Sequence, residues 1–299
     1  MYSYFSRKGV YMPTTYAHWR FGDKCIRMLP DDLQNIILNN RAIFDYGVHG
    51  PDIFFYYNCL KHNEVNRYGS AMHDIPYKDT LAQIKENFKK TENKDMALSY
   101  LLGFTCHFTL DSYCHGFIEK VDETMPYSHG KIESQFDRYL LIKDGFNPVT
   151  KSVTDMFHPD EKMAKVISGL FNKFDEDIIY KTLKDQKLYL NLLKDNSDIK
   201  RFFLTTAMDI AKVPSFKDLL ITKENVEELK PVNIRLNKYF DMALKHYPVL
   251  ADSLIGYLSD KNELNTYFKH NFSFKEDYRN LEILPLDEEL KYKVTALQD

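Results

Sequence analysis

Histidine and acidic side chains recur at intervals of four in two neighbouring segments of this sequence. His107, Asp111 and His115 lie within YLLGFTCHFTLDSYCHGFI, and His129 and Glu133 lie within SHGKIESQFDRYL. Each residue of an α-helix advances by about 100°, so residues four apart share one face. Each segment, if helical, therefore presents its histidine and acidic side chains as one stripe. Imidazole and carboxylate groups together are ligands that zinc accepts.

A metal site has to be weighed against plainer alternatives. A single histidine on an apolar helix is usually a core residue, and one His-x-x-x-Asp pair is usually an ion pair on a helix surface. Here three of the ten histidines fall within residues 107–129, each with an acidic partner at helical spacing. The first segment is otherwise apolar, and burying unpaired Asp and His side chains there would cost several kcal/mol. The density of ligand types favours a metal site, with the surface ion pair as the alternative.

The composition limits the fold and the kind of partner. The chain has 299 residues, with 21 Tyr, 21 Phe and only 11 Gly and 11 Pro. Few turn-forming residues and many periodic apolar segments predict an all-α protein of one large domain or two modest ones. The formal net charge is −3 with no basic block, so the sequence lacks the electrostatic footprint of a nucleic-acid-binding protein.

The periodic segments divide the chain into three predicted parts. Residues 1–155 form a metal-binding helical core, residues 156–260 a helical scaffold packed on that core as one domain, and residues 261–299 a polar tail. The ligand helices are predicted at about 95–118 and 128–143; the other helices are predicted at 16–29, 31–40, 41–47, 76–91, 160–174, 176–194, 198–213 and 231–259.

Local signals mark the ends of some of these helices. Thr14 or Thr15 is predicted to cap the first helix, Ser128 to cap the second ligand helix, and Gly145 to end it. Residues 47–74 show no clean period, and a loop of that length inside a compact domain is usually functional. Pro248 is expected to kink the last helix.

The cysteines, the N-terminal residues and the lengths of the apolar segments bear on where the protein resides. The four cysteines, Cys25, Cys59, Cys106 and Cys114, show no C-x-x-C pair and are not expected to form a disulfide framework, and Cys106 and Cys114 are expected to be buried free thiols. The first residues lack the unbroken apolar core of a signal peptide, and no segment has the apolar length of a membrane span. We therefore expect a cytoplasmic protein, with Met12 as an alternative start to Met1.

The order of the candidate ligands resembles that of the zinc-dependent bacterial phospholipases C, whose fold is shared with fungal single-strand-specific nucleases. The resemblance covers about Thr14 to Asp137, and the opening MPTTYAHWRFG is similar to the start of cytoplasmic members of the group. It implies an all-α domain with a three-zinc cluster in a cleft, here extended by C-terminal helices. In chain order the matching residues are His18, Asp52, His73, His107, Asp111, His115, His129 and Glu133.

The same resemblance implies how these residues divide among the zinc ions. Asp52, His73, His107 and Asp111 would hold one zinc, His115, His129 and Glu133 a second, and His18 a third, with Asp111 bridging. In the family a processed N-terminal tryptophan completes the third site, whereas the single tryptophan here, Trp19, is internal. Two zinc ions are therefore expected to bind firmly and a third weakly or not at all. The secreted enzymes also separate the residues matching Asp111 and His115 by two more positions.

This ligand set predicts hydrolysis of a phosphoester. Zinc ions a few Å apart can neutralise a phosphate and lower the pKa of water to around 7, and Asp52 is a candidate catalytic base as well as a ligand. The predicted function is a phosphodiester hydrolase of the phospholipase C type, with phospholipid as a candidate substrate. The alternatives are a nuclease or nucleotidase on the same fold, and a non-catalytic helical protein stabilised by zinc. The aromatic run after Asp52 either lines a substrate pocket or belongs to the core: Phe54, Phe55, Tyr56 and Tyr57.

Overall fold

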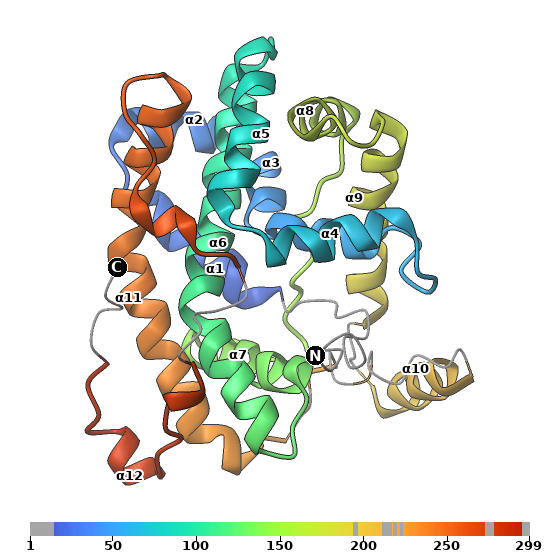
Figure 1. Cartoon of the computed structure of the whole chain (residues 1–299). Coiled ribbons are helices and arrows are strands. Elements are labelled where there is room, and N and C mark those ends of the chain that lie inside the picture. The colour runs from blue at the N-terminus through green and yellow to red at the C-terminus, as the bar shows by residue number, and fades with distance from the viewer. Residues whose placement is uncertain are drawn as a thin grey trace, which may run out of the picture.

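The computed structural model describes residues 15–193, 197–210, 217, 220–221, 224–272 and 278–294. Those residues form helices joined by turns and loops, and no strand occurs among them (Figure 1). The predicted all-α class is therefore confirmed. The division into three parts at residues 155 and 260 stays a prediction.

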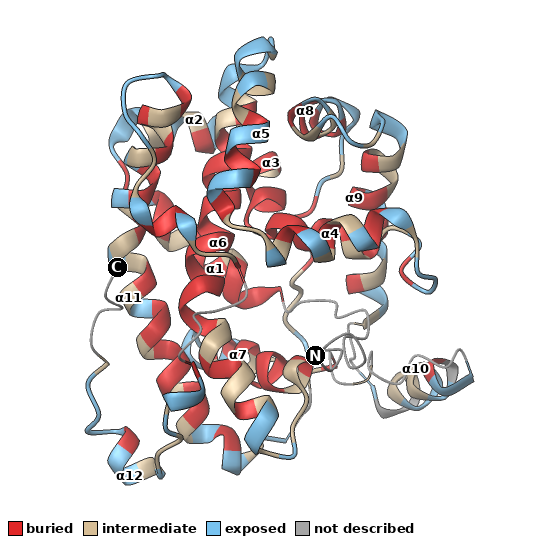
Figure 2. Cartoon of the chain, viewed as in Figure 1, coloured by how far each residue is buried: buried red, intermediate tan, exposed pale blue. Residues whose placement is uncertain are grey.

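A single long helix, α6 (Lys94–Thr124), runs through the middle of the molecule (Figure 1). It is buried along most of its length because other helices cover it on several sides (Figure 2). Short α3 (Arg41–Gly47) approaches it closely through a glycine pair. A Cβ on Gly47 would lie 2.4 Å from the Tyr100 carbonyl oxygen, and one on Gly103 would lie 2.6 Å from that of Phe44. Both glycines are therefore needed for the two backbones to meet.

Helices that precede α6 in the sequence and helices that follow it pack around α6. Before it come α1 (Tyr16–Ile26), α2 (Asp31–Asn39), α3, the 3₁₀ helix η2 (Gly50–Tyr56), α4 (Glu64–Asp74) and α5 (Tyr77–Lys90). After it comes α7 (His129–Lys143), which begins and ends as the sequence predicts. The Ser128 side chain accepts a hydrogen bond from the Lys131 amide, and Gly145 adopts φ +80° just past the end. A left-handed glycine is a common helix terminator.

Residues 47–74, predicted as a loop, are mostly helical, so that prediction is wrong. The segment contains η2 and α4, and Asn63 caps α4 by accepting a hydrogen bond from the Asn66 amide. The Asn66 side chain also donates to the carbonyl oxygens of Phe54, Phe55 and Tyr57. The segment shows little apolar periodicity because its helices are short and are stabilised by hydrogen bonds from polar side chains to the backbone. Periodicity alone therefore does not predict these helices.

The C-terminal half contains the four helices expected from its periodicity: α8 (Glu161–Phe171), α9 (Glu176–Leu193), α10 (Asp198–Ile210) and α11 (Lys230–Leu258). It also contains short elements that were not predicted, namely η4 (Glu227–Leu229), η5 (Thr266–Lys269), η6 (Tyr278–Asn280) and α12 (Leu286–Glu289). Residues 211–213, predicted as the end of α10, lie outside the described residues. Helix α11 continues through Pro248 and lies beside α6, where the Tyr247 hydroxyl donates to the Leu102 carbonyl oxygen at 3.1 Å (Figure 1).

Two further expectations are answered by burial and hydropathy. All four cysteines are buried free thiols, as predicted for Cys106 and Cys114. Part of the polar tail is docked on the helices, because Tyr267, Phe268 and Phe272 are buried in the core. Among the described residues, no helix combines the length and the hydropathy that crossing a bilayer requires.

Candidate metal centre

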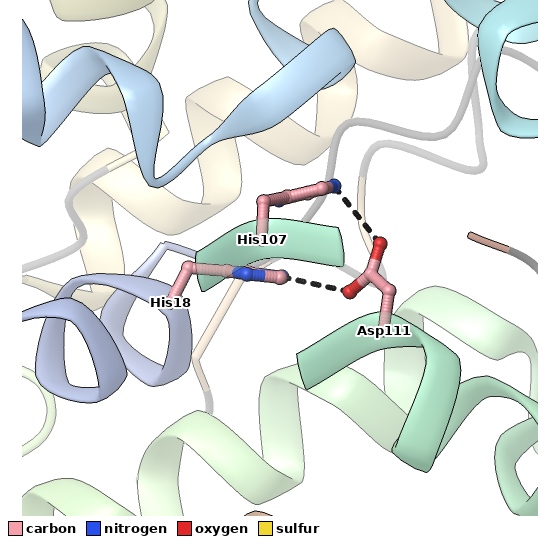
Figure 3. Close-up of side chains that lie close together, drawn as sticks. All are labelled: His18, His107 and Asp111. Atoms are coloured by element: carbon pink, nitrogen blue, oxygen red, sulfur yellow. Dashed lines mark ion pairs between the residues drawn. The ribbon is translucent and has the colours of Figure 1, made fainter. Parts of the chain in front are cut away.

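The stripe of side chains predicted on the first ligand helix lies along one face of α6. Its centre is Asp111, which is 3% exposed and has neighbours on both sides of its carboxylate. Its Oδ2 lies 2.9 Å from Nε2 of His107, one turn earlier, while its Oδ1 lies 3.4 Å from Nε2 of His18 (Figure 3). The same Oδ1 lies 3.7 Å from Nε2 of His115, one turn later. Asp111 therefore faces three imidazoles at once.

A second carboxylate, that of Asp52, faces two imidazoles. Residues from η2, α4 and α6 meet here. Asp52 Oδ1 lies 2.9 Å from Nε2 of His73, and Asp52 Oδ2 lies 3.5 Å from Nε2 of His107. His107 thus stands between two carboxylates, and its side chain is fully buried. The fold brings together residues that lie as far apart in sequence as positions 52 and 107.

Backbone carbonyl groups fix which imidazole nitrogen faces these carboxylates. His73 Nδ1 lies 2.8 Å from the Gly69 oxygen, and His107 Nδ1 lies 3.3 Å from the Val48 oxygen. A carbonyl oxygen can only accept, so each Nδ1 must carry the proton it donates. In a neutral imidazole the lone pair then lies on Nε2 and points at a carboxylate oxygen. A lone pair that faces a carboxylate oxygen is repelled unless a cation or a second proton lies between them. A metal ion bound by histidines oriented in this way meets that requirement.

A glycine lets the chain pass across the face of His107. Gly50, at the start of η2, adopts φ +49°. A Cβ at this position would lie 2.4 Å from the His107 ring. The positive φ and the close approach both favour glycine here. Gly50 therefore fixes the distance between the segment that carries Asp52 and the imidazole of α6.

The remaining predicted residues form a group at the junction of α6 and α7. Glu133 Oε1 lies 3.1 Å from Nε2 of His129 and 3.5 Å from Nε2 of His115. The two imidazole centroids are 5.2 Å apart. A carboxylate that sequence reasoning missed completes the arrangement, because Glu119 Oε1 lies 3.4 Å from Nδ1 of His129. Glu119 continues the α6 stripe by one more turn, so its spacing from His115 could have identified it.

The gathered carboxylates shift the pKa values of the histidines in the protein without metal. Burial alone would lower the pKa of His107, but Asp111 and Asp52 raise it to about 9. Burial would also lower the pKa of His129, but Glu133 and Glu119 raise it to about 10. The pKa values of Asp111 and Glu133 fall well below the usual range despite burial, because of the neighbouring imidazoles. The same carboxylates that hold these protons would also attract a cation.

His18 behaves differently from the other histidines. Burial, and then the neighbouring His107, lower its pKa to about 4. Its ring stacks on that of His107 with centroids 4.4 Å apart. Within the described residues, its Nδ1 is buried without a hydrogen-bond partner. His18 is therefore a neutral imidazole near neutral pH, which is the form that binds metals.

The first turn of α1, which carries His18, is fixed by a residue that the sequence did not identify. Thr15 occupies the cap position, but its side chain makes no cap hydrogen bond. The prediction of a Thr15 cap is therefore wrong, and Thr14 lies outside the described residues. Asp137 of α7 instead accepts hydrogen bonds from the amides of Thr15, Tyr16 and Ala17 at 3.0, 2.9 and 2.7 Å. No local signal could have identified a cap from a residue more than 100 positions away.

Two other features lie close to these side chains. His49, which the sequence analysis did not single out, is buried with its ring centroid 6.2 Å from that of His18. Its nearness in sequence to Asp52 was the only available signal. Phe55 stacks on His73 with centroids 5.5 Å apart, whereas Phe54 packs among Tyr68 and other aromatic side chains. Phe54 and Tyr56 are buried core residues.

Three groups of side chains satisfy the distances required of metal ligands. They are His18, His107 and Asp111; Asp52, His73 and His107; and His115, His129 and Glu133. Within each group the ligand atoms all lie within 4.8 Å of one another. Every one of the eight residues singled out in the sequence belongs to at least one group. Nitrogen and oxygen donors in groups of three match zinc sites that keep a position open.

Comparison with known proteins supports the same conclusion. The family model described as zinc-dependent phospholipase C matches residues 17–213, which is well over half of the chain and includes all eight of these residues. No curated protein and no solved structure matches the chain. The matched span and the three metal-type groups within it agree, and this chain therefore belongs to the zinc-dependent phospholipase C family.

Proposed function

We propose that this protein is a zinc-dependent phosphodiester hydrolase of the phospholipase C type. The observation that carries the proposal is the convergence of three groups of ligand atoms, two of which share His107, while the third lies next to them through the 3.7 Å pair of His115 and Asp111. Asp111 and His107 belong to the same group as His18, and His107 also belongs to the group of Asp52. Metal ions held by groups that share ligands lie close enough to engage one phosphate together. Family membership supports the reaction class.

The family resemblance divides the ligands among the zinc ions. Asp52, His73, His107 and Asp111 would hold one zinc ion, which is supported by the contacts of Asp52 with His73 and of His107 with both carboxylates. His115, His129 and Glu133 would hold a second. His18 and Asp111 would contribute to a third, and the two oxygens of Asp111 point to different histidines, as a bridging carboxylate requires. Sharing of Asp111 would keep the first and third positions at a fixed separation.

The chain's own residues would prepare the site for the reaction. Zinc, when bound, neutralises charge on phosphoryl oxygens and makes water acidic enough to lose a proton near neutral pH. The carbonyl oxygens of Gly69 and Val48 hold His73 and His107 in the tautomer that presents Nε2. Burial of His107 and Asp111 excludes bulk water from one side of the centre, which strengthens its electrostatic interactions. His115 and His129 are partly exposed, so the substrate would approach from their side.

We favour a ligand role for Asp52 over that of a catalytic base. Each of its oxygens faces an imidazole nitrogen, and the side chain is 5% exposed. A carboxylate engaged on both oxygens is poorly placed to take a proton from water. Asp52→Asn separates the roles, because loss of zinc indicates a ligand, whereas retained zinc with loss of rate indicates a base.

The substrate class proposed is a phosphodiester with a polar lipid as the preferred form. This choice rests on the family. Location in the cytoplasm stays a prediction, and an intracellular phosphoester is compatible with the same centre.

The test combines metal analysis with a substrate panel on the purified full-length chain. We expect at least two zinc ions per chain and hydrolysis of phosphatidylcholine micelles or of a chromogenic phosphodiester, both abolished by a chelator and restored by zinc. Glu133→Gln should remove one zinc and the activity, whereas His158→Ala, an exposed histidine of the same matched span, should change neither. Hydrolysis confined to single-stranded DNA or nucleotides would favour the nuclease alternative. Bound zinc with no hydrolysis of any phosphodiester would favour a structural role and overturn the proposal.

A further inference from the structure

Three of the ligand histidines are oriented by a partner on the nitrogen that does not face the metal position. His73 has the Gly69 carbonyl oxygen at Nδ1, His107 has that of Val48, and His129 has the Glu119 carboxylate. Such partners fix the ring orientation of metal-binding histidines, and their removal typically weakens metal binding about 10- to 100-fold. A contact made by the imidazole ring itself therefore determines the orientation of each of these three side chains.

His18 lacks this kind of support. Its Nε2 faces Asp111 at 3.4 Å, but its Nδ1 is buried with no hydrogen-bond partner in the described part of the chain. Beyond the contact with Asp111, the ring of His18 packs against those of His107 and His49, and neither of these contacts is a hydrogen bond. The backbone of the first turn of α1 must therefore determine where His18 points.

That backbone is held by Asp137. The first amides of a helix have no partner within the helix and need an acceptor from elsewhere. Asp137 Oδ2 accepts from the amides of Thr15 and Tyr16, and Asp137 Oδ1 accepts from that of Ala17, the residue before His18. Asp137 is itself 3% exposed, so water does not compete for these bonds.

Asp137 also belongs to the helix that carries the second ligand group. His129, Glu133 and Asp137 lie on successive turns of α7, so all three share one face. His129 and Glu133 face His115, while Asp137 faces the start of α1. Helix α7 thus contributes His129 and Glu133 directly to one metal position. Through Asp137 it also fixes, indirectly, the position of His18.

We propose that Asp137 is the positioning residue for the His18 metal site, and that it links this site to the His115, His129 and Glu133 site through α7. The inference rests on the proposed function only in its assignment of His18 as a zinc ligand. It assigns Asp137 no contact with substrate or metal. It explains why a histidine without an orienting partner lies in register with Asp111.

The test is zinc binding measured at equilibrium on the full-length chain, by chelator competition and by zinc content after dialysis. Asp137→Ala should lower the affinity of the zinc that depends on His18 by about 10- to 100-fold and leave the other sites filled. Asp137→Asn keeps one acceptor oxygen and should give an intermediate loss, and it carries the test if the alanine variant does not fold.

Two controls separate positioning from general docking of α1 on α7. Asp144→Asn removes a carboxylate that also ties α1 to α7, through the Tyr16 hydroxyl and the Arg20 guanidinium, but not through backbone amides. It should leave zinc binding unchanged. In a His18→Ala background, Asp137→Ala should cause no further loss of zinc, because a residue that acts through His18 has no effect without it.

The outcomes distinguish this proposal from the proposed function. If His18→Ala loses a zinc and Asp137→Ala does not, the positioning role is wrong and the metal assignment stands. Equal losses in Asp144→Asn, or a further loss in the His18→Ala background, would also overturn the positioning role. A wild-type chain whose zinc binding does not depend on His18 would overturn the assignment of His18 and, with it, this inference.

Discussion

The two ends of the candidate metal centre differ in burial and in the length of chain that assembles them. At one end His107 and Asp111 are buried side chains, joined by Asp52 from a distant segment. At the other end His115 and His129 are each 14% exposed and come from consecutive helices, α6 and α7. Buried charged groups cost more to leave unpaired than exposed ones. The buried end should therefore control stability, and the exposed end should control access and chemistry.

Asp111→Ala should show the largest effect, because Asp111 faces three imidazoles. In the metal-free protein its loss leaves buried His107 without its nearest carboxylate, and breaking a buried ion pair typically costs about 3–5 kcal/mol. Urea unfolding monitored by circular dichroism, with zinc content in parallel, measures both consequences. We expect loss of stability and of more than one zinc.

The matched change at the exposed end is Glu133→Ala, which should remove one zinc with a smaller loss of stability, because the imidazoles of His115 and His129 that it leaves without a carboxylate are partly exposed. If the two variants lose equal stability, burial does not separate the two ends of the centre. Unchanged stability and zinc content in Asp111→Ala would show that the α6 stripe is only a network of ion pairs.

Gly50→Ala should disturb the buried end without removing a ligand. The new Cβ would lie 2.4 Å from the His107 ring, and the positive φ is unfavourable for alanine. Together these effects should destabilise the protein by about 1–3 kcal/mol. Thermal unfolding and zinc affinity measure the result.

Gly145→Ala is the control, since it also has a positive φ but has no neighbouring atom within 4 Å of the added Cβ. Equal destabilisation by both substitutions would mean that backbone strain alone acts and that the contact with His107 contributes nothing.

Glu119→Gln tests the exposed end in the same way. Glu119 faces Nδ1 of His129 and should orient that ring toward the metal position. Its replacement should weaken one zinc about 10- to 100-fold, with little change in the stability of the metal-free protein. Zinc competition with a chelating dye measures the affinity. An affinity equal to that of the wild type would leave Glu119 as a solvated side chain, and a large loss of stability would place it with the buried end instead.

The pH dependence of the metal-free protein tests the histidines of both ends together. The pKa of His107 is raised to about 9 and that of His129 to about 10, above the ordinary value of 6.5. A raised folded-state pKa contributes stability that is fully present below pH 6.5 and is lost as the pH rises through 9 and then 10. Urea midpoints of the metal-free chain should therefore fall from pH 7 to pH 10.

Zinc should reverse this trend, because binding displaces these protons and becomes easier as the pH rises. The zinc-loaded chain should thus gain stability relative to the metal-free chain across the same interval. Parallel curves for the two forms would show that His107 and His129 keep their protons when zinc binds, and would remove both from the ligand sets.

The sequence by itself determined the parts of the centre that depend on local geometry. His107, Asp111 and His115 share a face because a helix repeats every 3.6 residues or so, and the same holds for His129 and Glu133. Ser128 and Gly145 mark the ends of α7 because caps act on adjacent backbone groups. The all-α class followed from periodicity and from the scarcity of glycine and proline.

The tertiary structure decided everything that requires two distant segments to meet. Asp52 and His73 were found through the order of residues in a known family, since no local spacing relates them to His107. The contact of Gly50 with His107 and the cap that Asp137 provides to α1 had no local signal. Residues 47–74 carried one in the Asn63 cap, but they lack the apolar periodicity that indicates a helix. A side chain can accept hydrogen bonds from the backbone of another helix only after the two helices have packed together. The residues next to it in the sequence therefore do not reveal such a contact.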